Sequence, residues 1–226
     1  QMGKLSNVDV HLAAHGGDKF NYTNLPMASS WDIDKHSAFV HFVINETVHG
    51  LQYRDVPKLD EGMPPLVCDM SSEILSRNIN VSDFGVIYAG AQKNIGPSGA
   101  TIVIIREDLL DRCSDHVPDV WNYKSHVRKQ GMYNTPATYP IYISGLVFRW
   151  LQAQGGVAEI ETINALKAKI LYDAIDNSAG FYVNNVHLDA RSKMNVVFHT
   201  RTKELDELFA QESTNHGLQL LRGYQS

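Results

Sequence analysis

Four short apolar runs in the first half of the chain have the pattern of buried β-strands. Their hydrophobicity is continuous rather than alternating, and polar or glycine-rich segments separate them: residues 38–44 (AFVHFVI), 65–68 (PLVC), 84–89 (FGVIYA) and 101–105 (TIVII). Continuous runs of this kind are typical of sheets that are covered on both faces. The pattern therefore predicts an α/β domain.

Helical spacing dominates the second half of the chain. Three further elements are predicted there: helices over residues 144–154 and about 157–175, and a strand over residues 194–199. Thr202 is placed to cap one more helix, which Gly217 ends. The change near Gly155 from buried strands to helices predicts two domains, residues 1–155 and 156–226.

Composition narrows the class of protein. The chain has 226 residues, a formal net charge of −5, and 43% hydrophobic against 20% charged residues, which is ordinary for a globular protein. Lys and Arg are scattered, which argues against a nucleic-acid surface, and no apolar stretch reaches the roughly 20 residues of a membrane span. Two cysteines cannot build a disulfide framework, so we expect a cytoplasmic protein.

Polar residues beyond the strand ends are the first candidates for chemistry, because ligands of α/β proteins bind there. They are Thr47, Asp69 and the group Gln92-Lys93-Asn94. An aspartate in such a place is more often a turn former, and a lysine is more often simply solvated. The small residues around Lys93, in AGAQKNIGPSG, alter these odds. They would let a cofactor approach a partly desolvated amine, as a Schiff base with pyridoxal phosphate requires, and Asp69 is then the candidate partner for the pyridine nitrogen.

Other reactive side chains have more ordinary interpretations. Ten histidines form no H-E-x-x-H or H-x-H pattern, so no metal site is predicted. His36 and His41 are assigned no chemistry. Arg77 is either a solvated side chain or a group that helps to neutralise a phosphate.

Four longer strings carry a resemblance to a known family. They are NETVHG (45–50), CDMSSEILSRNINVSDFGVIYAGAQKNIGPSGATIVIIREDLL (68–110), MYNTPATYPIYISGLVFRWL (132–151) and GGVAEIE (155–161). In these strings, and in their order, the segment from Ala38 to His199 resembles the phosphoserine aminotransferases, which are class V aminotransferases of fold type I. The resemblance implies a large domain with a mainly parallel sheet and a smaller C-terminal α/β domain.

The resemblance also implies roles for individual residues. Lys93 would form the Schiff base with pyridoxal 5′-phosphate and move a proton, and Asp69 would pair with the pyridinium nitrogen. Thr47 and Gln92 would contact the cofactor. Asn134 and Thr135 would reach the cofactor phosphate of the other subunit, which implies an obligatory homodimer.

The implied reaction transfers an amino group in two halves. Glutamate leaves as 2-oxoglutarate, and 3-phosphohydroxypyruvate becomes O-phospho-L-serine, in serine biosynthesis and in some bacteria also in pyridoxine biosynthesis. The alternatives are another class V enzyme, such as an alanine–glyoxylate aminotransferase or a cysteine desulfurase, and a catalytically silent fragment that does not retain cofactor.

The resemblance begins inside the large domain and stops early, so we expect a chain truncated at both ends, with two partial domains. Such a chain would lack the family's glycine-rich phosphate loop and the aromatic side chain that stacks on the cofactor ring. Tyr224 and Gln225 stand where many members carry a basic pair.

Overall fold

The structure, a computed structural model, describes residues 8–18 and 21–221, so Tyr224 and Gln225 lie outside the described residues. The chain forms two compact units that alternate along the sequence. Unit 1 contains Gln1–Ala14, Met27–Ile44 and Val56–Glu161, and unit 2 contains His15–Pro26, Asn45–Asp55 and Thr162–Ser226. The domain boundary expected between residues 155 and 156 stays a prediction.

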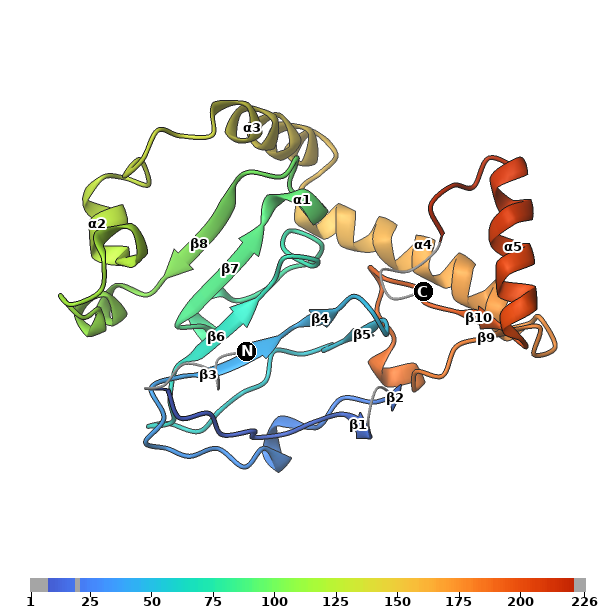
Figure 1. The fold of residues 1–226 in the computed structure, drawn as a ribbon, viewed down its shortest axis with the longest axis horizontal. Coiled ribbons are helices and arrows are strands. Elements are labelled where there is room, and N and C mark those ends of the chain that lie inside the picture. The colour runs from blue at the N-terminus through green and yellow to red at the C-terminus, as the bar shows by residue number, and fades with distance from the viewer. Residues whose placement is uncertain (1–7, 19–20, 222–226) are drawn as a thin grey trace. The chain divides into compact units, whose positions relative to one another are not determined.

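A four-stranded sheet organises unit 1 (Figure 1). Its strands, in spatial order, are β3 (Val40–Val43), β6 (Leu66–Asp69), β7 (Val86–Gly90) and β8 (Thr101–Ile105). The first three are parallel to one another, and β8 is antiparallel to β7. All four strands expected from the apolar runs are confirmed, and so is the mainly parallel sheet; the antiparallel β8 was not predicted.

The two faces of this sheet differ in burial. Phe42 and Cys68 lie on the buried face, where the Phe42 ring stacks on that of Phe84 at 6.4 Å and Trp31 tilts against it. The opposite face carries His41, which is exposed, together with partly buried side chains. The expectation that both faces are covered holds in β7, where the neighbouring Val86 and Ile87 are both buried, but it is wrong for β3, where His41 and Val43 are exposed.

Unit 1 has one short α-helix between β7 and β8, and its other α-helices follow the sheet in the chain. Together they are α1 (Ala91–Asn94), α2 (Tyr123–Arg128), α3 (Thr138–Ala153) and the start of α4 (Val157–Asp176). The helix expected from residue 144 instead begins at Thr138. Pro140 lies in its first turn, where backbone N–H groups have no partner within the helix, so the proline breaks no hydrogen bond there. Short 3-10 helices cover Ala28–Ser30, Val81–Asp83, Glu107–Arg112 and Asp119–Trp121.

Unit 2 contains the rest of α4 from Thr162, three strand pairs and one further helix. The antiparallel pairs are β1 (Gly17–Asp18) with β2 (Asn21–Tyr22), β4 (Asn45–Glu46) with β5 (Leu51–Gln52), and β9 (Tyr182–Val183) with β10 (His199–Thr200). A 3-10 helix covers Leu188–Ala190, and α5 covers Lys203–Asn215. The rings of Tyr182, Phe198 and Phe209 meet edge to face at 5.3–5.8 Å. This cluster packs α5 against the β9–β10 pair.

Two expectations for this region have different outcomes. The helix after Thr202 is confirmed, and so is its cap: the Thr202 hydroxyl accepts a hydrogen bond from the Leu205 N–H at 3.3 Å. The strand expected over residues 194–199 is wrong, because only His199 belongs to one. Side chains bind that backbone instead: Ser192 Oγ accepts two successive N–H groups, and Asn184 Nδ2 donates to the Val197 carbonyl.

Candidate active site

Asp69 occupies the carboxyl end of β6. In the parallel register it lies directly opposite Tyr88 of β7, and the phenol hydrogen-bonds to its carboxylate. Asp69 Oδ1 also accepts the Ser71 N–H at 2.9 Å. A partly buried carboxylate with two donors is thus fixed at the sheet edge where α/β proteins bind ligands.

Lys93 lies at the same edge of the sheet. β7 ends at Gly90, whose N–H donates to Ser71 Oγ at 3.1 Å, so the segments that follow β6 and β7 are tied together. The short helix α1 then begins at Ala91 and carries Lys93. Strand pairing therefore brings Asp69 and Lys93 to one place.

Small residues after Lys93 let the chain turn closely against its neighbours. A Cβ at Gly96 would stand 2.9 Å from Ser144 Oγ, and Gly99 has a left-handed φ of +113°. The side chains of Gln92 and Lys93 are exposed. The partial burial expected around the amine is therefore not seen among the described residues.

The other predicted cofactor ligands come from other segments of the chain. Thr47 is in unit 2, in the turn between β4 and β5, where Glu46 accepts the Val48 and His49 N–H groups. Asn134 and Thr135 are exposed in the loop between α2 and α3 of unit 1. The resemblance assigns this pair to the cofactor of a partner subunit. The structure describes a single chain, so the role of Asn134 and Thr135 stays a prediction.

His41, which sequence reasoning had assigned no chemistry, lies beside the candidate carboxylate. Its Nε2 is 2.9 Å from the Tyr88 hydroxyl, and the two rings lie nearly parallel. Desolvation lowers the pKa of His41, and the Asp69 charge partly opposes this. Desolvation, and then Asp69, raise the pKa of Tyr88 to about 12. The sequence did contain a signal for this pair, because His41 and Tyr88 are polar rings that each interrupt an apolar strand run.

Arg77 is neither solvated nor open to solvent anions in this structure. Its Nε donates to Glu73 Oε1 at 2.5 Å, and the two side chains are 14% and 2% exposed. The solvated interpretation of Arg77 is therefore wrong, since a buried carboxylate holds its guanidinium.

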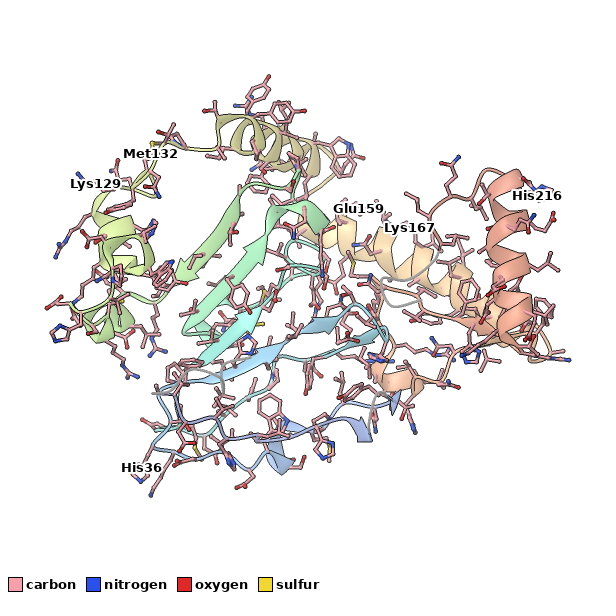
Figure 2. The ribbon with its side chains drawn as sticks, in the orientation of Figure 1. His36, Lys129, Met132, Glu159, Lys167 and His216 are labelled. Carbon is pink, nitrogen blue, oxygen red and sulfur yellow. The ribbon has the colours of Figure 1, made fainter. Side chains whose placement is uncertain are left out.

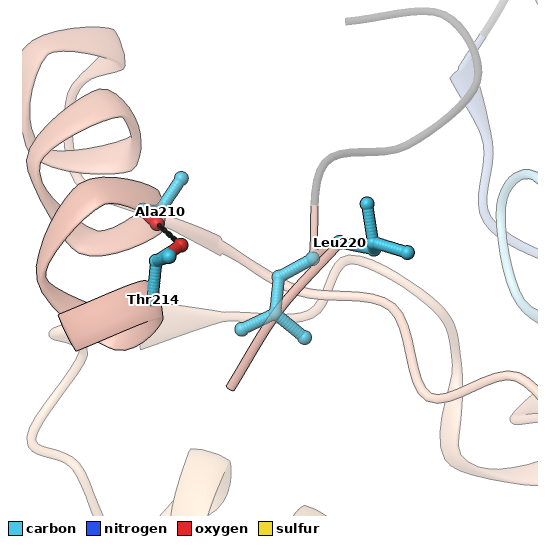
Figure 3. Close-up of a pocket in the computed structure, with 4 residues that line it drawn as sticks. Ala210, Thr214 and Leu220 are labelled. Atoms are coloured by element: carbon cyan, nitrogen blue, oxygen red, sulfur yellow. Dashed lines mark hydrogen bonds between the residues drawn. The ribbon is translucent and has the colours of Figure 1, made fainter. Parts of the chain in front are cut away.

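A hollow beside α5 contains none of the candidate residues. It is lined by Ala210, Thr214, Leu220 and Leu221 (Figure 3). Thr214 Oγ1 donates to the Ala210 carbonyl at 2.9 Å, so this hydroxyl is bonded within its own helix.

The described residues form neither a cluster of metal ligands nor a membrane-spanning helix. No group of three or more His, Cys, Asp or Glu side chains within residues 8–18 and 21–221 could hold a metal ion. Across the same ranges, no helix combines the length and the apolar character needed to cross a membrane.

The family model described as "Aminotransferase class-V" matches residues 3–219 of the chain. The chain belongs to the class-V aminotransferase family. It is 63% identical over all 226 residues to the phosphoserine aminotransferase of Neisseria gonorrhoeae, of which it covers 61%. The chain thus spans about three fifths of the length of this curated relative.

Solved class-V structures have the same fold. A phosphoserine aminotransferase studied for radiation damage of its Schiff base is 42% identical, with a TM-score of 0.87 over 90% of this chain and 56% of that one. A phosphoserine aminotransferase from Trichomonas vaginalis, with pyridoxal phosphate bound, is 33% identical, with a TM-score of 0.89 over 98% of this chain and 62% of that one. The expected fold type I architecture and the resemblance to phosphoserine aminotransferases are confirmed.

Proposed function

We propose that this chain carries the lysine and the acid of a pyridoxal-phosphate-dependent phosphoserine aminotransferase. The reversible reaction converts 3-phosphohydroxypyruvate and L-glutamate into O-phospho-L-serine and 2-oxoglutarate. It belongs to serine biosynthesis. The main support is the 63% identity over the whole chain to an enzyme of that name, together with Asp69 and Lys93 at neighbouring strand ends. A related phosphorylated oxo acid of pyridoxine biosynthesis is a second proposed substrate.

The side chains at this edge suit the proposed cofactor. When bound, pyridoxal phosphate supplies an electron sink for charge that develops at the substrate Cα. Asp69, once ionised, is purely an acceptor, and the Ser71 N–H and the Tyr88 hydroxyl already hold it. It would keep a proton on the ring nitrogen. Lys93 Nζ would bind the cofactor's aldehyde carbon and, when free, take the proton from the substrate Cα.

The remaining proposed contacts define the assembly. Thr47 and Gln92 would bind the cofactor within one subunit, and Asn134 and Thr135 would bind the cofactor phosphate of the partner. The active form would then be a homodimer, because each site draws residues from both subunits. We propose the cytoplasm as its location.

Borohydride labelling tests the cofactor and the substrate class together. The chain is incubated with pyridoxal phosphate and reduced with tritiated borohydride, before or after exposure to O-phospho-L-serine. Amino transfer releases the cofactor from the lysine. We therefore expect O-phospho-L-serine to lower the amount of tritium bound to the protein, and L-serine to leave that amount unchanged.

Two results would contradict the proposal, each in a different part. Equal loss of label with L-serine and O-phospho-L-serine would contradict the proposed substrate class. A chain that takes up no label beyond that of a Lys93→Ala variant would support the alternative of a silent fragment, which the exposure of Lys93 favours.

A further inference from the structure

Three side chains on adjacent parallel strands share one face of the unit 1 sheet. Asp69 of β6 is opposite Tyr88 of β7, and His41 of β3 is opposite Val67, two residues before Asp69. Residues two apart on a strand point to the same face. His41 and Tyr88 therefore flank the strand that carries Asp69, and the Tyr88 hydroxyl reaches both His41 and the carboxylate.

The chemistry of these groups fixes the direction of each hydrogen bond. An ionised carboxylate only accepts, so the Tyr88 hydroxyl must donate its one proton to Asp69. The Tyr88 oxygen is then left as an acceptor toward His41 Nε2, 2.9 Å away. His41 must therefore carry a proton on Nε2 and donate it to Tyr88.

We propose that His41 and Tyr88 are positioning residues that hold the Asp69 carboxylate in a fixed orientation, with His41 donating from Nε2 to Tyr88 and Tyr88 donating to Asp69. The role of this chain of hydrogen bonds in holding the cofactor rests on the function proposed above. Neither residue touches the reacting atoms in this account, since each acts through Asp69.

The electrostatics of the two residues fit this role. With its pKa raised to about 12, Tyr88 keeps its proton and remains a donor at neutral pH. The lowered pKa of His41 favours a neutral ring. A neutral imidazole adds no positive charge beside Asp69, so the carboxylate stays available to a protonated ring nitrogen. Ser71 supplies a second donor from the backbone, which side-chain variants leave in place.

The tautomer of His41 can be measured without cofactor. Two-dimensional ¹H–¹⁵N spectra of the cofactor-free chain distinguish protonated from unprotonated imidazole nitrogens, and His41→Leu assigns the signals. We expect the proton on Nε2, and Tyr88→Phe, which removes only the hydroxyl, to change the tautomer ratio. A proton held on Nδ1, or a ratio that Tyr88→Phe leaves unchanged, would overturn the hydrogen-bond chain.

A second measurement follows ¹⁵N-labelled pyridoxal phosphate bound to the chain, with the ring-nitrogen shift and the cofactor Kd as readouts. We expect Tyr88→Phe and His41→Leu to reduce ring-nitrogen protonation and to weaken cofactor binding about tenfold, a typical loss for a hydrogen bond to a charged group. His41→Gln should restore both values, because its amide nitrogen can donate from the position of Nε2.

Matched controls separate this effect from general damage. His36→Leu removes an imidazole from a loop of unit 1, where Figure 2 labels it, and Tyr142→Phe removes an exposed hydroxyl from α3. Both should leave the ring-nitrogen shift unchanged. If the parent chain binds no cofactor, the proposed function fails while the tautomer result still decides the hydrogen-bond chain. If the parent binds it and Tyr88→Phe keeps a fully protonated ring nitrogen, the positioning role is wrong.

Discussion

The buried ion pair between Glu73 and Arg77 makes a quantitative prediction about the segment that follows Asp69. The side chains are 2% and 14% exposed, and the Nε–Oε1 distance is 2.5 Å. Removal of one partner from a buried pair leaves the other charge poorly solvated, which typically costs about 3–5 kcal/mol. We therefore expect Glu73→Ala to lower the free energy of unfolding by that amount.

Lys169 and Asp173 provide an internal control for this cost. They have the same four-residue spacing on α4, but their side chains are 68% and 55% exposed. Exposed pairs of this kind contribute only about 0.3–0.5 kcal/mol. Asp173→Ala should therefore barely alter stability.

Urea denaturation followed by circular dichroism measures both changes. With a slope of about 2–3 kcal/mol per M urea, Glu73→Ala should lower the midpoint by about 1–2.5 M, and Asp173→Ala should hardly move it. Equal small shifts for the two variants would refute the argument that burial sets the strength of the Glu73–Arg77 pair. Glu73→Gln, which keeps the shape but not the charge, should fall between Glu73→Ala and the parent.

Variants at three further positions test other parts of the chain. Gly99→Ala should destabilise the loop after α1 by about 1–2 kcal/mol in thermal unfolding, because φ is +113° and a Cβ would stand 3.0 Å from Pro140; an unchanged Tm would contradict this. Thr202→Ala should cost about 1 kcal/mol through loss of the α5 cap, and Thr202→Ser should recover most of it. Hydrogen bonds from Arg191 lower the pKa of Asp176, so this contact stabilises the fold above the ordinary aspartate pKa of 3.8 and is lost as pH falls through the lower folded value. Asp176→Asn should therefore make the free energy of unfolding less dependent on pH in this acid range.

Strands and the lysine turn could be predicted because their signals are local. The run at residues 101–105 became β8 with unchanged bounds, and the small residues after residue 88 form the short turn that carries Lys93. The failure at residues 194–199 has an equally local cause. An apolar run forms a strand only if its backbone groups hydrogen-bond to a neighbouring strand. In residues 194–199 the side chains of Ser192 and Asn184 bind backbone groups instead.

Contacts across strands could not be predicted from the sequence. His41 lies 28 positions before Asp69 in the numbering, and only the register of β3, β6 and β7 brings it to the Tyr88 hydroxyl. Arg77 was also misjudged, because its burial depends on a carboxylate inside a compact turn rather than on its own neighbours in sequence. Apolar periodicity identifies strands, whereas strand order and register decide which polar side chains meet.

The position of the reduced cofactor label tests the central claim most directly. The chain is loaded with pyridoxal phosphate, reduced with borohydride and digested, and the modified peptide is sequenced by mass spectrometry. The account predicts modification at Lys93, its loss in Lys93→Ala, and its retention in a Lys129→Ala control, which removes a lysine next to the C-terminus of α2 (Figure 2). Label spread over many lysines, or label that survives Lys93→Ala unchanged, would contradict the assignment of Lys93 as the cofactor-binding amine.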